Sequence, residues 1–187
     1  MQNQTLSFIA GLIAMTWVVL SYFVDKKKTY LIFQATGIVF LILSYFFIGK
    51  FFAMIGLIVG LARAVTFFLY ENNDKNAPFA LSFTFALLTV LAYVLVNAVI
   101  LKEYAVLDSL YLVALVFYAF TFRIRNLSVM RLVTIIPTGL SVVYGVGIGA
   151  TAFVIVSYVF EFFANLLAIF RQDILPKIKL KNKRENN

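Results

Sequence analysis

A single arginine inside an apolar segment constrains this chain more than any other feature. Residues 49–70 form that segment, GKFFAMIGLIVGLARAVTFFLY, and Arg63 lies well inside it. About 20 predominantly apolar residues span the hydrocarbon core of a bilayer, so the segment predicts a transmembrane helix. A guanidinium at that depth costs roughly 2.5 kcal/mol or more, and it is tolerated where it faces a bundle interior and has a partner. Glu161 is the one acidic residue deep in any other apolar segment and is therefore the predicted partner.

The composition excludes a soluble fold. The 187 residues are 63% hydrophobic and 13% charged, with a mean hydropathy of +0.98, which predicts an integral membrane protein. Neither cysteine nor histidine occurs, which removes disulfides, thiolate and imidazole metal ligands, and Cys or His nucleophiles. The sequence has no metalloprotease, P-loop, nucleophile-elbow or paired-carboxylate motif. We therefore expect no enzymatic activity, no cofactor and no metal site.

Seven apolar segments, separated by charges and turn residues, divide the chain. They are continuous and about twice as long as a membrane β-strand, so we expect helices and not a barrel. The first segment has no basic region before it, and we expect a retained helix instead of a signal peptide. The predicted spans are residues 6–24, 30–48, 50–70, 78–101, 105–122, 128–147 and 150–171.

The basic residues predict an orientation. With the DKKK loop at 25–28 on the cytoplasmic side, only Lys50 and Lys102 of the 16 lysines and arginines fall outside, while Arg63 lies within the membrane. The positive-inside rule then selects seven spans, an external N-terminus and a cytoplasmic C-terminus. We expect the basic tail, residues 173–187, to bind anionic lipid. Nucleic acid is not an expected partner, because the tail has no aromatic residues that could stack on bases.

An internal repeat organises the spans. At an offset of about 100 residues the basic loops, the short external turns, and the helices of Arg63 and Glu161 correspond. The repeat predicts an all-α fold of two parallel triple-helix bundles joined by an inverting linker helix. Arg63 lies 14 residues after Gly49 and Glu161 lies 12 after Gly149, so their depths differ by only about 3 Å. The predicted divisions are residues 1–71 (first bundle), 72–103 (linker helix with its loops), 104–172 (second bundle) and 173–187 (tail).

Three stretches carry a resemblance to a known family: residues 22–51, YFVDKKKTYLIFQATGIVFLILSYFFIGKF; residues 61–71, LARAVTFFLYE; and residues 160–173, FEFFANLLAIFRQD. They resemble the YgjV-like family of bacterial inner-membrane proteins, and the 3+1+3 plan resembles the PnuC and SWEET transporters. In the family's third-span pattern, N-A-x-R, Arg63 keeps the arginine and Gly60 replaces the asparagine. The resemblance implies a location in the bacterial cytoplasmic membrane.

The predicted substrate site is centred on Arg63 and Glu161. Asn165 follows Glu161 by one helical turn and shares its face, and Gln34 adds an amide from the second span. These side chains are expected to bind a small polar solute. The alternative is a static ion pair between Arg63 and Glu161 that fixes the register of the bundles.

Aromatic residues near the ends of spans are candidates for stacking on a flat ligand. Such residues more often belong to the belt at the membrane surface. The candidates are Trp17, Tyr45, Tyr93 and Tyr144.

Two residues are predicted hinges. Pro137 should interrupt the sixth span, and Gly37 is its counterpart in the second span. A packing kink is the alternative role. Threonine hydroxyls nearby are expected to bond the preceding turn of their own helix, and these are Thr36, Thr134 and Thr138.

Two functions remain open at the level of sequence. The first is transport of a small polar solute by alternating access around Arg63 and Glu161, facilitated or ion-coupled because no ATP-binding motif is present. The second is a non-transporting membrane scaffold or accessory protein with a structural ion pair. A polar cavity beside Arg63 favours the transporter, and a tightly packed centre favours the scaffold.

Overall fold

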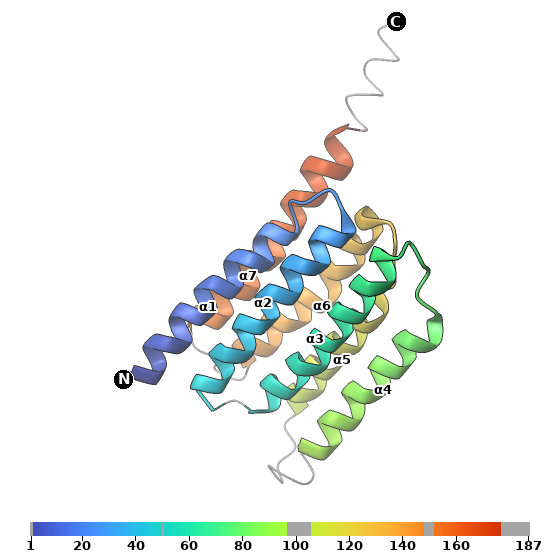
Figure 1. The fold of residues 1–187 in the computed structure, drawn as a ribbon. Helices are drawn as coiled ribbons and strands as arrows, with labels where there is room; N and C mark the ends of the chain where they lie inside the picture. The colour runs from blue at the N-terminus through green and yellow to red at the C-terminus, as the bar shows by residue number, and fades with distance from the viewer. Residues whose placement is uncertain (1, 50, 97–105, 148–151, 177–187) are drawn as a thin grey trace, which may run out of the picture.

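Helices make up the regular structure of the chain. The computed structural model describes residues 2–49, 51–96, 106–147 and 152–176, and no strand occurs among them. The predicted all-α fold with seven helices is confirmed for these residues (Figure 1). The predictions for Lys50, Lys102, Gly149 and residues 177–187 lie outside the described residues. The helices are α1 (Gln2–Ser21), α2 (Lys27–Phe47), α3 (Phe51–Asn72), α4 (Phe79–Leu95), α5 (Val106–Thr121), α6 (Leu127–Gly147), α7 (Ala152–Ala168) and the π-helix η2 (Ile169–Ile174).

The lengths of the helices match a bilayer. Among the described residues, α1, α2, α3, α6 and the continuous α7–η2 segment are long and apolar enough to cross a membrane. Helices α4 and α5 are apolar but shorter, with 17 and 16 residues. At 1.5 Å per residue these two cover about 25 Å, slightly less than a typical hydrocarbon core. The chain is therefore built as a multi-pass membrane protein.

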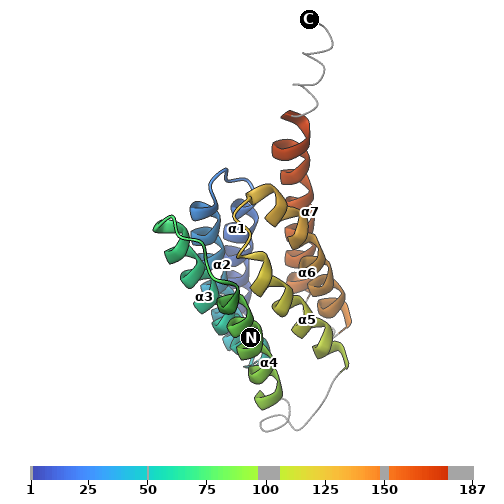
Figure 2. The same cartoon turned by 90° about the vertical axis from the view of Figure 1, so that its right-hand side faces the viewer.

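Six helices form a closed ring. Neighbouring helices pack in the order α1, α2, α3 in the first half and α5, α6, α7 in the second half, and contacts of α1 with α7 and of α3 with α5 close the ring. Helix α4 lies outside this ring against α3 and α5 (Figure 2). Successive helices run in opposite directions, so α1 and α5 are parallel (Figure 1). The two halves therefore have the same orientation, as the repeat predicts.

Local sequence explains several helix ends. Gly49 has a φ of +70° immediately after the last turn of α2, a conformation that glycine adopts without steric cost. The side chain of Asn126 accepts hydrogen bonds from the backbone N–H groups of Ser128 (3.0 Å) and Val129 (3.3 Å), and this caps the start of α6. Pro78 precedes α4 in an extended conformation. These residues set the short turns that hold neighbouring helices antiparallel.

Gly37 lets α1 and α2 pack closely. A Cβ atom at this position would lie 2.6 Å from Val18 Cγ2 and 3.2 Å from the backbone oxygen of Ala14. Helix α2 continues without a break on both sides of Gly37. The described structure therefore gives Gly37 a packing role inside the first half.

Helix α6 also runs without a break through Pro137, so the predicted interruption is wrong. Hydroxyl groups around the proline donate to carbonyls four residues earlier, and such bonds help a membrane helix to tolerate proline. The predicted bonding of threonines to their own helix is confirmed by distances of 2.7 to 3.0 Å. The bonds are Thr134 to Met130, Thr138 to Thr134, Ser141 to Pro137, and, in α2, Thr36 to Ile32.

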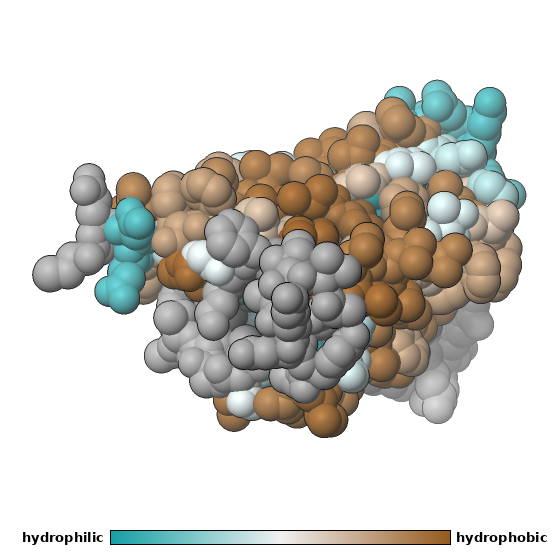
Figure 3. Space-filling view, turned by 90° about the horizontal axis from the view of Figure 1, so that it is seen from below, coloured by the Kyte–Doolittle hydropathy of each residue, from teal (hydrophilic) through white to brown (hydrophobic). Residues whose placement is uncertain are grey.

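Large apolar side chains cover the outside of the bundle. Phe83 on α4, Leu132 on α6 and Leu167 on α7 are each more than half exposed. In Figure 3 most of the coloured surface is hydrophobic, and hydrophilic groups gather at its left and upper-right edges. A surface of this kind suits hydrocarbon and not water.

Candidate functional site

A cavity of about 60 Å³ lies inside the helix ring. Every helix of the ring contributes to its wall, whereas α4 contributes no residue. The volume is enough for a few water molecules, each of which needs roughly 10–15 Å³. The lining residues are Val18, Gln34, Ile38, Leu41, Leu57, Gly60, Arg63, Tyr111, Leu115, Tyr118, Phe122, Ser141, Tyr158 and Glu161.

Arg63 enters the cavity wall from the middle of α3. Its side chain is 3% exposed, and Nη1 donates to the backbone oxygen of Leu115 at 2.8 Å. The guanidinium carbon lies 5.0 Å from the ring centroid of Phe122 and 5.8 Å from that of Tyr118. Nε is buried and has no acceptor in the described part of the chain. One carbonyl and two aromatic faces therefore stabilise this cation.

Glu161 enters the cavity wall from α7. Its Oε1 accepts hydrogen bonds from Tyr22 (2.7 Å) and Tyr118 (3.4 Å). The Tyr118 hydroxyl also lies 3.1 Å from Oγ1 of Thr138. Tyr22 follows α1, and Tyr118 belongs to α5, so the carboxylate joins both halves of the ring through tyrosine hydroxyls.

Arg63 and Glu161 do not form the predicted ion pair. The ion pairs within 4.0 Å in the described residues are Lys27 with Glu71 and Lys28 with Asp74. Tyr118 explains the separation, because its ring faces the guanidinium while its hydroxyl bonds the carboxylate. The prediction of direct contact is therefore wrong. Both residues nevertheless line the same cavity, and the prediction that they bind a solute there stays a prediction.

Of the other predicted site residues, only Gln34 lines the cavity. Its Nε2 donates to Oγ of Ser21 at 2.9 Å. Asn165 is fully buried and donates to the backbone oxygen of Arg131 at 2.9 Å, which ties α7 to α6. Asn165 therefore holds helices together beside the cavity and does not line it.

The aromatic candidates pack among protein side chains. Trp17 packs against Phe33 in a T-shaped arrangement, with 5.0 Å between the ring centroids. Tyr144 stacks on Tyr111 at 4.6 Å and donates to Asp108 at 3.2 Å. Neither Trp17 nor Tyr144 is among the lining residues of the central cavity.

Two other aromatic candidates make hydroxyl contacts. Tyr45 on α2 lies 3.0 Å from the hydroxyl of Tyr158 on α7, and Tyr93 lies 3.3 Å from Ser109. Both Tyr45 and Tyr158 are buried, so this pair joins the two halves inside the protein.

Sequence reasoning missed the tyrosines of the site. Tyr158 precedes Glu161 by three residues and shares its helix face, so its position could have been predicted. Tyr118 lies within a predicted span, where a polar hydroxyl is also a signal. Tyr22 has no comparable signal, because its approach to Glu161 depends on how α1 packs against α7.

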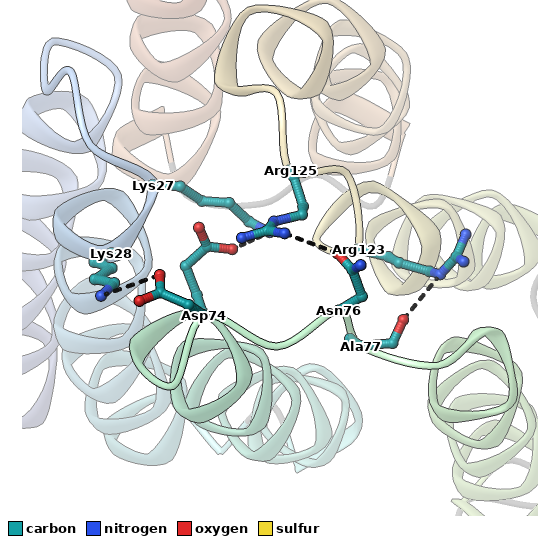
Figure 4. A network of polar contacts seen from close by, with 8 residues as sticks. Lys27, Lys28, Asp74, Asn76, Ala77, Arg123 and Arg125 are labelled. Carbon is teal, nitrogen blue, oxygen red and sulfur yellow. Dashed lines mark hydrogen bonds and ion pairs between the residues drawn. The ribbon is translucent and has the colours of Figure 1, made fainter.

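Charged side chains join the loops at one end of the bundle, which we call the basic end: residues 22–28, 71–78 and 122–126 together with η2. Figure 4 shows part of it. Lys27 pairs with Glu71 at 3.1 Å within the first half. Across the loops, Arg125 donates to Oδ1 of Asn76 at 3.0 Å and Arg123 donates to the backbone oxygen of Ala77 at 3.2 Å (Figure 4).

Two further contacts at the basic end reach the end of α1. Arg131 on α6 donates to the backbone oxygen of Val24, and Gln172 on η2 donates to that of Phe23 at 2.8 Å. Arg131 is 3% exposed. The second half therefore bonds backbone carbonyls of the loop that follows the first helix.

Comparison with family models, curated proteins and solved structures gave no match. The chemistry of the site must therefore be read from its residues. The cavity offers guanidinium donors, a carboxylate acceptor and an amide, between walls of tyrosine and leucine. In the described residues no cluster of three or more His, Cys, Asp or Glu side chains could hold a metal ion. The arrangement suits reversible binding of a small polar molecule.

Proposed function

We propose that this chain is a membrane transporter that binds a small polar solute in the central cavity and moves it by rocking of its two triple-helix halves. The observation that carries the proposal is the pair of separated charges, Arg63 and Glu161, on the wall of one cavity. Ionisable groups inside a membrane are costly and are found mainly where they serve a pathway or a binding site.

The scaffold alternative requires a structural ion pair between Arg63 and Glu161 at the centre of the bundle. A structural ion pair gains stability only when the two charges meet with good geometry and are fully hydrogen-bonded. In the described structure Arg63 and Glu161 lie more than 4.0 Å apart, and Arg63 keeps a buried donor without an acceptor. The cavity and the separated charges support transport.

The location is part of the proposal. Lysines and arginines concentrate at the basic end, and the positive-inside rule assigns such an end to the cytoplasm. We place the chain in the bacterial cytoplasmic membrane, in the YgjV-like family, with the start of α1 outside. Anionic lipid at the basic end is the proposed second partner.

Flux measurements test the proposal. Purified protein is reconstituted into liposomes, and uptake of labelled amino acids, nucleosides, sugars and organic acids is compared with that of empty liposomes. We expect uptake of at least one class, lost in Arg63→Gln and retained in Arg171→Gln, where the same change is made on an exposed arginine at η2. Folded protein that carries no class of solute would contradict transport and favour the scaffold.

A further inference from the structure

The hydrogen-bonding capacity of Arg63 is only partly used. A guanidinium has five N–H donors in a planar fork, and Leu115 accepts from one nitrogen of Arg63. Nε is buried with no acceptor in the described residues. The group that fits such a fork best is a planar oxyanion, because a carboxylate accepts two parallel bonds from a guanidinium. Arg63 therefore provides the half of a site that recognises a carboxylate.

Glu161 provides the complementary half. Both tyrosine hydroxyls bond its Oε1, and the side chain is part of the cavity wall. A carboxylate accepts about four hydrogen bonds, so capacity remains for a donor inside the cavity. An ammonium group, with three donors and a positive charge, satisfies this capacity and compensates the charge of Glu161.

Charge balance selects a solute with both groups. Arg63 and Glu161 together are neutral, so a solute with net charge leaves one charge in the membrane interior without compensation. A monoanion would satisfy Arg63 and leave Glu161 unbalanced, and a monocation would do the reverse. A solute that carries one negative and one positive group compensates both and keeps the centre of the protein neutral.

The dimensions of the cavity restrict the solute to a small molecule. The volume of about 60 Å³ corresponds to a few waters. Tyr118 contacts both charges, with its ring 5.8 Å from the Arg63 guanidinium and its hydroxyl 3.4 Å from Glu161. The solute that fits this cavity is therefore small, and its two charged groups are joined by a short chain.

We infer that the central cavity binds a small zwitterion, with its carboxylate on Arg63 and its ammonium group on Glu161. The inference rests on the proposed binding of a solute in this cavity. It adds the class of solute, small amino acids and related zwitterions, and it assigns one charge to each half of the helix ring.

A comparison of probes on the wild-type protein tests the class. The thermal stability and the heat of binding of the purified protein are measured with glycine, β-alanine and γ-aminobutyrate. Acetate and ethylamine carry one charge each and serve as matched half-molecules, and urea is the uncharged control. We expect the zwitterions to bind at least tenfold more tightly than either half-molecule. We also expect the affinities of the three zwitterions to depend on the distance between their two charges.

Variants test the assignment of the two charges. Arg63→Gln and Glu161→Gln each remove one charge-assisted contact, and each should weaken the best zwitterion by about 10- to 100-fold. Arg171→Gln should leave affinity unchanged, because Arg171 is exposed and outside the cavity. If Arg63→Gln does not fold, Arg63→Lys keeps the charge without the fork, and the wild-type probe series still decides the class.

The outcomes separate this inference from the proposed function. Acetate binding as tightly as glycine, or affinity unchanged in Glu161→Gln, overturns the zwitterion and leaves transport intact. Zwitterion binding without uptake into liposomes supports the site and overturns transport. If no zwitterion binds at millimolar concentration, the inference fails, and the flux of the wider panel alone then decides whether the protein is a transporter.

Discussion

The two ends of the helix ring are joined by different chemistry. At the basic end, Arg131, Arg125 and Gln172 of the second half donate to carbonyl and amide oxygens that follow α1 or α3. Toward the other end, the hydroxyls of Tyr45 and Tyr158 join α2 to α7. Hydrogen bonds from charged groups contribute about 1.5–3 kcal/mol, and neutral ones about 0.5–1.5 kcal/mol. Because the bond at the end with the tyrosine pair is the weaker kind, we expect the two halves to separate more easily at that end.

The largest expected effect lies at the basic end. Arg131→Gln should lower the free energy of unfolding by about 3 kcal/mol, because it removes a buried charged donor and leaves the backbone oxygen of Val24 without this bond. Chemical unfolding in detergent measures the loss. Arg123→Gln is the control, since this exposed arginine also bonds a backbone carbonyl and should cost no more than about 0.5 kcal/mol. Equal losses of unfolding free energy in the two variants would contradict the larger contribution expected of the buried Arg131 contact.

A second prediction concerns the close packing of α1 against α2 within the first half. Gly37→Ala should destabilise the protein by about 1–3 kcal/mol, since the new methyl group would meet Val18 at 2.6 Å and the backbone of Ala14 at 3.2 Å. Gly139→Ala is the matched control, with its nearest atom, on Phe162, at 3.8 Å. Melting temperatures of the two variants compare them directly. A tolerated Gly37→Ala would show that α1 and α2 shift easily against each other.

A smaller loss of stability is expected at the end of the ring where Tyr45 meets Tyr158. Tyr45→Phe should cost about 1 kcal/mol, because it removes the neutral hydrogen bond to Tyr158. Tyr158→Phe should cost somewhat more, because its hydroxyl also bonds Tyr111. The double variant should cost little more than Tyr158→Phe alone, and this non-additivity is read from a double-mutant cycle of unfolding free energies. Fully additive losses would mean that the two hydroxyls do not depend on each other.

The finest test asks from which side the cavity opens. The chain has no cysteine, so Ser141→Cys places a single thiol on the cavity wall. A membrane-impermeant thiol reagent should label it from the side opposite the basic end, and Tyr45→Phe should raise the rate about two- to tenfold. Ser82→Cys, at a fully buried position on α4 outside the central cavity, should remain unlabelled. Faster labelling from the basic end would mean that the cavity opens there and not at the end with the tyrosine pair.

The helices were predictable because apolar length and charge position are properties of the chain itself. Residues on either side of Arg63 are apolar for a whole span, and no soluble arrangement accommodates that pattern. The repeat also follows from the sequence, since it depends on the order of spans and loops. These features need no knowledge of side-chain packing.

The contacts of the site were harder to predict. Depth along two helices placed Arg63 and Glu161 at one level, but the rotation of each helix about its axis decides which side chains meet. Tyr118 contacts both residues from a third helix, and Tyr22 reaches Glu161 from the turn after α1. Such meetings depend on the packing of several helices together, and span lengths and charge positions carry no information about them.

The position of α4 outside the ring has a consequence for modularity. Its residues contact α3 and α5 and leave the cavity wall to the other six helices, so its main contribution is to return the chain across the membrane before the second half begins. In engineering terms α4 is a covalent tether, and the ring is a dimer of three-helix units fused into one polypeptide. Co-expression of the two units as separate chains, both inserted in the same orientation, should rebuild the same centre.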